Sequence, residues 1–164
     1  MVEIKKLRLY LETTVFNYYF DTDRNGHEDT VKLFEAIGAG KFEGYTSRYA
    51  VSEIEMTTEP KCSRMLDLIT KYGISVFDFD EVSKLLANRY ISESIFTENQ
   101  RLDSLHVAVA SVHALDCLIS YNFKHINRAR TKVYTTTINQ EEGYNGIVIL
   151  TSGEVLNIET LQFI

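Results

Sequence analysis

The sequence predicts an α/β domain with a mostly parallel central sheet. Two observations lead to this prediction. Five short apolar segments have the length and composition of buried strands, and segments with helically spaced apolar residues separate them. The chain has 164 residues, of which 45% are hydrophobic, so one domain spanning residues 1–164 can bury its own core.

The first predicted strand shows the alternation of a half-buried strand, because leucines alternate with Arg8 and Tyr10. The predicted strands are Leu7–Leu11, Glu43–Thr46, Ile74–Phe79, Cys117–Ser120 and Gly146–Leu150. Functional sites of parallel sheets form outside the carboxyl ends of the strands. The residues that follow the strands, Glu12, Thr46–Ser47 and Tyr121–Asn122, are therefore candidates for the site.

The helices are predicted from apolar spacing and from capping residues. We expect Thr13 or Thr14 to cap a helical turn toward Phe20. The further predicted helices are Glu28–Ala39, the segment from Ser47 through Glu55, Cys62–Tyr72, the segment from Asp80 through Ile91, Asp103–Leu115 and Ile126–Asn139. The segment Asp103–Leu115 is apolar on nearly all sides, which predicts a central, buried helix.

Charge and cysteine content exclude several classes of protein. The formal net charge is −6, which is unfavourable for nucleic-acid binding unless positive charge is concentrated locally. Two cysteines without a CxxC spacing give neither a disulfide framework nor a zinc ribbon. No secretory signal and no apolar stretch of about 20 residues is present, so we expect a cytoplasmic protein without a membrane segment.

Four acidic residues occupy special positions: Glu12, Glu53, Asp103 and Asp116. Carboxylates gathered at one cleft repel each other, and a divalent cation removes that penalty. Oxygen-only ligands suit Mg²⁺ or Mn²⁺ rather than zinc. Taken singly, each acid has a simpler interpretation as a helix cap, a solvated helix face or a salt-bridge partner. Glu55 is a second candidate beside Glu53.

Four segments resemble the conserved blocks of PIN-domain proteins, in the family's order. They are LRLYLETTVFNYYFD (Leu7–Asp21), TSRYAVSEIE (Thr46–Glu55), RLDSLHVAVASVHALDCLISYNFKHI (Arg101–Ile126) and GYNGIVILTSGEVL (Gly143–Leu156). The resemblance implies a three-layer α/β/α PIN-like fold and metal-dependent hydrolysis of phosphodiester bonds, usually in RNA. It also implies a VapC-type toxin of a toxin–antitoxin pair, with an antitoxin partner and, in some relatives, a homodimer.

The resemblance assigns the catalytic roles to Glu12, Glu53, Asp103 and Asn122, with the first three as metal ligands. Two departures from the family pattern stand out. Most relatives have Asp at the position of Glu12, and many have an acid where this chain has Asn122. An amide supplies a neutral oxygen but no charge, so we expect one firmly bound metal and one transient metal.

Supporting roles fall to neighbours of these residues. Asn122, and with it Thr13 or Thr14, is expected to position a phosphate or a metal-bound water molecule, and Asp116 to hold the loop of Asn122. Positive charge for RNA phosphates is expected from Lys124, His125, Arg128 and Arg130, which follow Asn122 closely, with Lys132 beyond them. A short basic run can equally be the solvated face of a helix. Tyrosines 18, 19 and 121 could stack on unpaired bases or pack in the core.

Other functions remain as alternatives. A degenerate PIN module would bind RNA or a protein partner without cleaving. A receiver domain would need an acid pair near the first strand, which the segment LYLETT lacks. Nucleotide-binding glycine loops and the GxSxG nucleophile motif are missing from the sequence. His106 and His113 have no third zinc ligand at a suitable spacing and are expected to be packed histidines.

Overall fold

The computed structural model describes residues 5–161, with side-chain positions up to residue 158. Its centre is a sheet of five parallel strands in the order β3-β2-β1-β4-β5. The strands are β1 (Arg8–Leu11), β2 (Glu43–Ser47), β3 (Ser75–Phe77), β4 (Cys117–Ile119) and β5 (Val148–Leu150). Because all strands run the same way, their carboxyl ends meet at one edge of the sheet.

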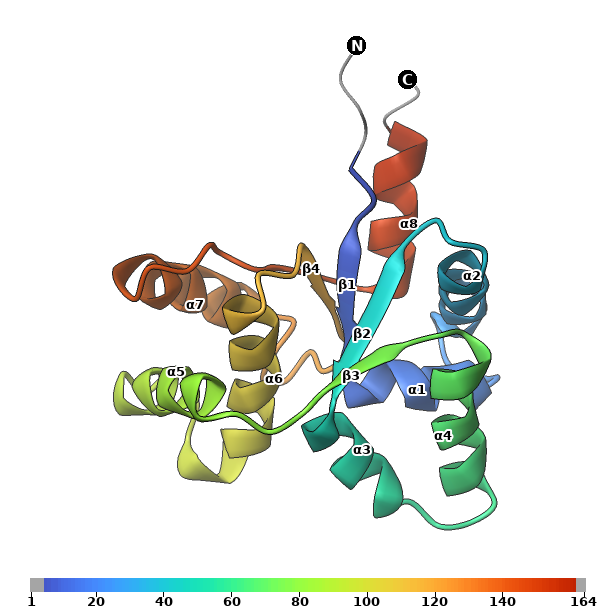
Figure 1. The fold of residues 1–164 in the computed structure, drawn as a ribbon, viewed down its shortest axis with the longest axis horizontal. Helices are drawn as coiled ribbons and strands as arrows, with labels where there is room; N and C mark the ends of the chain where they lie inside the picture. Colours follow the sequence, from blue (N-terminus) through green and yellow to red (C-terminus); the bar gives the residue numbers. More distant parts are fainter. Residues whose placement is uncertain (1–4, 162–164) are drawn as a thin grey trace.

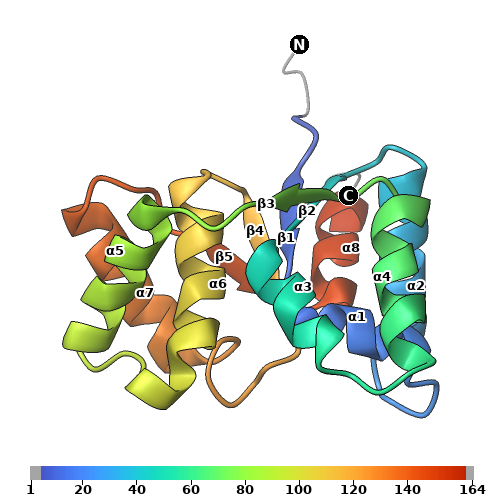
Figure 2. The same ribbon diagram turned by 60° about the horizontal axis from the view of Figure 1, so that its bottom comes forward.

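Helices cover both faces of this sheet, as Figures 1 and 2 show. The helices are α1 (Thr13–Phe20), α2 (His27–Gly38), α3 (Arg48–Glu55), α4 (Lys61–Lys71), α5 (Glu81–Ser92), α6 (Arg101–Val112), α7 (Ala129–Glu141) and α8 (Ser152–Leu161), with a 3₁₀ turn η1 (Glu98–Gln100) before α6. Helices α5, α6 and α7 lie on one side, and α1, α2, α4 and α8 on the other. Helix α3 continues from β2 and contacts α1, α4 and α6.

The alternation of strand residues explains the two layers, because successive side chains of a strand point to opposite faces. In β1, Tyr10 joins the core formed with α5, α6 and α7, whereas Leu9 and Leu11 join the core formed with α1, α2 and α4. In β4, Leu118 joins the same core as Tyr10, and Ile119 joins the same core as Leu9 and Leu11. The predicted α/β/α architecture with a parallel sheet is therefore confirmed.

The predicted helix Asp103–Leu115 is observed as α6, whose residues Ser104–Ser111 are all buried, as expected of a central helix. The structure also contains a helix that the sequence did not predict. Helix α8 was not predicted, because Thr151, Ser152 and Gly153 at its start have the composition of a loop. Among residues 5–161, no helix is both long and apolar enough to cross a membrane.

Candidate active site

Glu12 is the first acidic group of the site and lies at the carboxyl end of β1. It is 2% exposed, yet its carboxylate is well satisfied. The hydroxyls of Ser120 and Thr14 each donate to Glu12 Oε1 at 2.6 Å, and the Thr14 backbone N–H donates to Oε2 at 3.2 Å. Glu12 is thus the N-cap of α1, in place of the predicted Thr13 or Thr14. The cap fixes this carboxylate at the sheet edge.

Asp103 reaches the same edge from the first turn of α6 and is held there by Asn122. The Asn122 amide donates to Asp103 Oδ1 at 3.1 Å, and its carbonyl oxygen accepts the His125 backbone N–H at 3.0 Å. The Asn122 backbone N–H donates to Ser120 Oγ at 3.0 Å, and that hydroxyl donates to Glu12. A continuous chain of hydrogen bonds therefore connects Glu12 with Asp103.

The pKa of Asp103 depends on its burial and on the charged side chains around it. Burial raises the pKa of Asp103, and the charges of Glu12 and Glu53 raise that pKa further. The charges of His106 and His125 act in the opposite direction and only partly offset these effects. Burial is thus the main reason for the raised pKa, and the two neighbouring carboxylates add to it. A bound cation would stabilise the ionised form of Asp103.

Glu53 points toward this edge from α3 and is held by two donors. Thr13 Oγ1 donates to Glu53 Oε1 at 2.8 Å, and His106 Nε2 lies 2.5 Å from the same oxygen. On its other side, His106 Nδ1 lies 2.6 Å from the Tyr10 hydroxyl, which is also 2.6 Å from Ser47 Oγ. A buried chain of polar side chains thus runs from β2 through β1 and α6 to Glu53.

Burial alone would lower the pKa of His106, but the hydrogen bond and the charge of Glu53 outweigh it, and the pKa is raised. Burial would likewise raise the pKa of Glu53, yet the hydrogen bond and charge of His106 and the hydrogen bond from Thr13 lower it. The raised pKa of His106 and the lowered pKa of Glu53 both favour a pair of charged side chains. His106 is fully buried and the Glu53 side chain is 27% exposed.

The expectation for His106 was incomplete. His106 is a buried histidine, as predicted, but it also orients Glu53. The sequence contained one signal for this role, because Asp103 and His106 are three residues apart and so share one face of the helix. The spacing of His106 and His113 does not indicate this role. The role of Ser120 was missed, although Ser120 directly follows β4. Thr14 was expected to contact a phosphate or a water molecule, and in the structure it contacts Glu12.

Asp116 lies away from the site, so the prediction that it holds the loop of Asn122 is wrong. It precedes β4, at the opposite end of that strand from Asn122. Its carboxylate accepts the Arg8 backbone N–H at 2.8 Å and the Lys5 ammonium at 2.9 Å. Asp116 therefore fixes the amino end of β1 against the start of β4.

The four basic residues that are predicted to contact RNA phosphates all follow Asn122, but they differ in exposure and in the hydrogen bonds that their side chains make. Lys124 is exposed, and His125 Nδ1 lies 3.0 Å from Gln100 Nε2. The Arg128 guanidinium donates to Thr131 Oγ1 at 3.2 Å. The Arg130 guanidinium donates to the carbonyl oxygens of residues 94 and 95, at 2.9 and 3.1 Å. Arg130 therefore joins the start of α7 to the turn after α5, and RNA binding by these four residues stays a prediction.

The donor chemistry of the site fits a hard divalent cation. Glu12 and Asp103 offer carboxylate oxygens, and among the described residues the second carboxylate oxygen of Asp103 accepts no hydrogen bond. No three acidic, histidine or cysteine side chains in the described part of the chain already form a metal-binding group. Mg²⁺ commonly binds through only one or two carboxylates, with waters and substrate phosphates as the other ligands. Two carboxylates therefore suffice for such a site.

Comparisons with known proteins give the same fold. The sequence matches no protein-family model and no curated protein. The structure is similar to a chain of VapBC2 from Rickettsia felis bound to a promoter DNA fragment, with 10% identity, a TM-score of 0.56 and coverage of 87% of this chain and 97% of that chain. It is also similar to VapC20 of Mycobacterium tuberculosis, described as a sarcin–ricin loop cleaving toxin, with 11% identity, a TM-score of 0.56 and coverage of 71% and 92%. The chain has the PIN-domain fold of the VapC-type toxins.

Proposed function

We propose that this protein is a metal-dependent endoribonuclease and the toxin of a toxin–antitoxin pair. One observation carries the proposal. Glu12 and Asp103 converge from β1 and α6 on the carboxyl edge of a parallel sheet, connected through Ser120 and Asn122. The charges of Glu12 and Glu53 add to the effect of burial on the pKa of Asp103, and a divalent cation would stabilise these carboxylates in their ionised form.

Each residue then has a defined task. Glu12 and Asp103 would hold Mg²⁺ or Mn²⁺, and Glu53 supplies a third carboxylate whose direction is set by Thr13 and His106. When bound, such a cation lowers the pKa of water and offsets the charge that develops on the phosphate. Asn122 keeps Asp103 turned toward the edge.

The similar structures support the substrate and the partner. VapC20 is described as cleaving the sarcin–ricin loop, which is RNA, and this favours RNA as the substrate class here. VapBC2 is a complex of toxin and antitoxin, which favours an antitoxin as the protein partner. The exposed Lys124 adds a positive charge beside Asn122, where an RNA phosphate would approach.

A cleavage assay tests this proposal. The purified protein is incubated with labelled single-stranded RNA in the presence of Mg²⁺, Mn²⁺ or EDTA. We expect internal cleavage with either metal, no cleavage in EDTA, and recovery after metal is added back. Products that form equally in EDTA would contradict the proposal, since the carboxylates need a cation to act.

Ser120 allows a test of how the Glu12 carboxylate is positioned. Ser120→Ala removes the donor to Glu12 and the acceptor of the Asn122 backbone N–H. We expect a 10- to 100-fold loss of activity or metal affinity, the range typical of residues that orient metal ligands. The measurement is the Mn²⁺ dependence of the cleavage rate. Ser83→Ala is the control, because Ser83 is also buried but bonds Asp80 at the start of α5; an equal loss in both variants would contradict the positioning role.

A second candidate function is a binding module that does not cleave RNA. The observation in its favour is that His106 and Thr13 already engage Glu53, while Asn122 contributes no charge. Folded protein that binds RNA but cleaves it with none of the metals would favour this function.

A further inference from the structure

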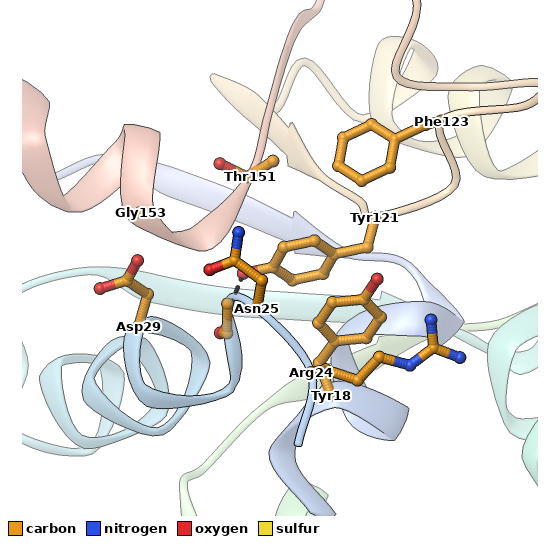
Figure 3. Close-up of a pocket in the computed structure, with 9 residues that line it drawn as sticks. Tyr18, Arg24, Asn25, Asp29, Tyr121, Phe123, Thr151 and Gly153 are labelled. Atoms are coloured by element: carbon orange, nitrogen blue, oxygen red, sulfur yellow. Dashed lines mark hydrogen bonds between the residues drawn. The ribbon is translucent and has the colours of Figure 1, made fainter. Parts of the chain in front are cut away.

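A polar and aromatic hollow lies next to Tyr121, in the loop that follows β4. Its volume is about 380 Å³, within the range of small-ligand sites. It is lined by α1, the turn after it, the start of α2, the loop after β4, and the start of α8, as Figure 3 shows.

Tyr121 forms a rigid wall of this hollow. Its ring stacks on Tyr18, with ring centres 3.8 Å apart and planes 7° from parallel. Its hydroxyl donates to the Gly26 carbonyl at 3.2 Å and lies 3.0 Å from Thr30 Oγ1. A Cβ on residue 26 would approach the Tyr121 ring to 2.9 Å, and the φ of Gly26 is +109°, so only glycine allows this close packing. Tyr121 is therefore not free to swing out.

Phe123 is the accessible ring of the group. It is 56% exposed, although it meets Tyr121 edge to face with ring centres 6.2 Å apart. An exposed aromatic face supported from below by a fixed aromatic wall suits the stacking of a planar ligand. Stacking on such a platform is how proteins bind unpaired nucleobases irrespective of sequence.

Polar groups complete the hollow at its other walls. The Arg24 guanidinium lies over Tyr18, 5.4 Å from the ring centre, and Asn25, Asp29 and Thr151 add amide, carboxylate and hydroxyl groups. Figure 3 shows Arg24 beside Tyr18, and Asp29 near the start of α8. A nucleobase combines an apolar face with a rim of donors and acceptors, and this hollow offers partners for both.

The hollow is connected with the carboxylates by direct contacts. Thr14 Oγ1 accepts the Tyr121 backbone N–H at 2.9 Å and donates to Glu12 at 2.6 Å. Asn122, which holds Asp103, stands between Tyr121 and Phe123 in the same loop. A strand whose phosphate lies at Glu12 and Asp103 would therefore bring a neighbouring base to the hollow.

We propose that this hollow binds one unpaired nucleobase of the RNA strand, stacked on Phe123, next to the phosphate that is cleaved. The inference rests on the proposed function for the position of the cleaved bond. Base binding itself does not depend on cleavage. RNA is favoured over a protein segment because Lys124 follows Phe123 and the hollow is lined by several hydrogen-bonding groups rather than by aliphatic ones.

The chain contains no tryptophan, so Phe123→Trp introduces a single tryptophan at the platform, which can be excited selectively over the tyrosines. Its emission is followed in EDTA while poly(A) or poly(U) oligonucleotides are added, with tripolyphosphate as a probe that has charge but no base. We expect quenching by both oligonucleotides and none by tripolyphosphate. Phe79→Trp is the matched control, because Phe79 is a 47% exposed phenylalanine that follows the edge strand β3, which β2 and β1 separate from β4. Its emission should not change.

Binding constants separate stacking from simple apolar contact. Phe123→Ala and Phe123→Leu should both bind the oligonucleotides at least about fivefold more weakly than the wild type, because one base stack contributes about 1–3 kcal/mol. Phe79→Ala should bind as the wild type does. A Phe123→Leu variant with wild-type affinity would overturn the proposal, since leucine keeps the apolar volume but has no aromatic face.

Two further outcomes distinguish this inference from the proposed function. If the wild type cleaves RNA but oligonucleotides leave the tryptophan of the Phe123→Trp variant unquenched, the base site is refuted and the nuclease stands. If quenching occurs and no metal supports cleavage, the base site stands and the nuclease does not. Emission that shifts with protein concentration in the absence of RNA would assign the ring to contact with a second copy of the chain and would also overturn the proposal.

Discussion

Asp103→Asn should lower the rate of RNA cleavage by at least about 100-fold, while the protein keeps its fold. Residues that merely orient metal ligands contribute about 10- to 100-fold, so the loss of a direct ligand charge should cost at least as much. Asparagine has nearly the same shape and can still accept a hydrogen bond from the Asn122 amide. The single-turnover cleavage rate at saturating Mn²⁺ measures this effect, and circular dichroism checks the fold.

Asp116→Asn is the matched control for this experiment. The substitution is the same, but Asp116 lies at the opposite end of β4, where it accepts hydrogen bonds from the Arg8 backbone N–H and the Lys5 ammonium. We expect cleavage within a factor of about two of the wild type, as for substitutions away from the site. Equal losses in the two variants would mean that the activity reflects general stability, and unchanged activity in Asp103→Asn would remove Asp103 from the catalytic group.

His106→Leu should reduce the free energy of unfolding by about 2–4 kcal/mol. Leucine fills much of the buried volume, but Glu53 then loses its charged partner and the Tyr10 hydroxyl loses one of its two contacts. Removing one member of a buried pair typically costs about 3–5 kcal/mol, and the partial exposure of Glu53 places the effect at the lower end. Urea unfolding in EDTA measures this difference.

The difference in stability between the wild type and His106→Leu should depend on pH. The pKa of His106 is raised, so its contribution is complete below the unfolded value of about 6.5 and is lost as pH rises through the raised pKa. The pKa of Glu53 is lowered, so its contribution is complete above about 4.3 and is lost as pH falls through the lowered pKa. The difference should therefore be largest between about pH 4.3 and pH 6.5.

His113→Leu provides the comparison. His113 stacks on Phe77 and is 30% exposed, and its nearest acid, Asp80, is 3.5 Å away. Its loss should cost below about 1 kcal/mol, as expected for a weak, partly exposed pair. A flat pH profile for the stability difference of His106→Leu would contradict the charged pair and leave only packing as its contribution.

The strands and most of the helices could be predicted because each element leaves a local pattern. Leucines alternate in β1, and the N-caps Ser47 and Asp80 precede their helices, as the structure confirms. Helix α8 begins with residues of loop composition and was missed for that reason. Glu12 was predicted as a site residue, but its capping role depends on a side chain that turns back to the next backbone amides.

The contacts between distant parts of the chain could not be predicted in this way. His106 and Glu53 are 53 residues apart, and nothing local to either residue indicates the other. The same holds for Thr14 and Tyr121, which are 107 residues apart and join the carboxylates to the hollow. Asp116 shows that closeness in sequence can also mislead. It is near Asn122 in sequence but lies at the other end of β4, so it does not hold the loop of Asn122.

The burial of α6 affects how fast its backbone amide hydrogens exchange with solvent. Eight successive residues of this helix, Ser104–Ser111, are buried, and they include His106. The most protected amides of a protein exchange with solvent only when the whole fold opens. Backbone amides of α6 should therefore belong to the slowest-exchanging hydrogens of the chain, while those around the exposed Phe123 exchange through local motion. Asp103 and His106 would then keep their relative positions whenever the loop that carries Asn122 opens.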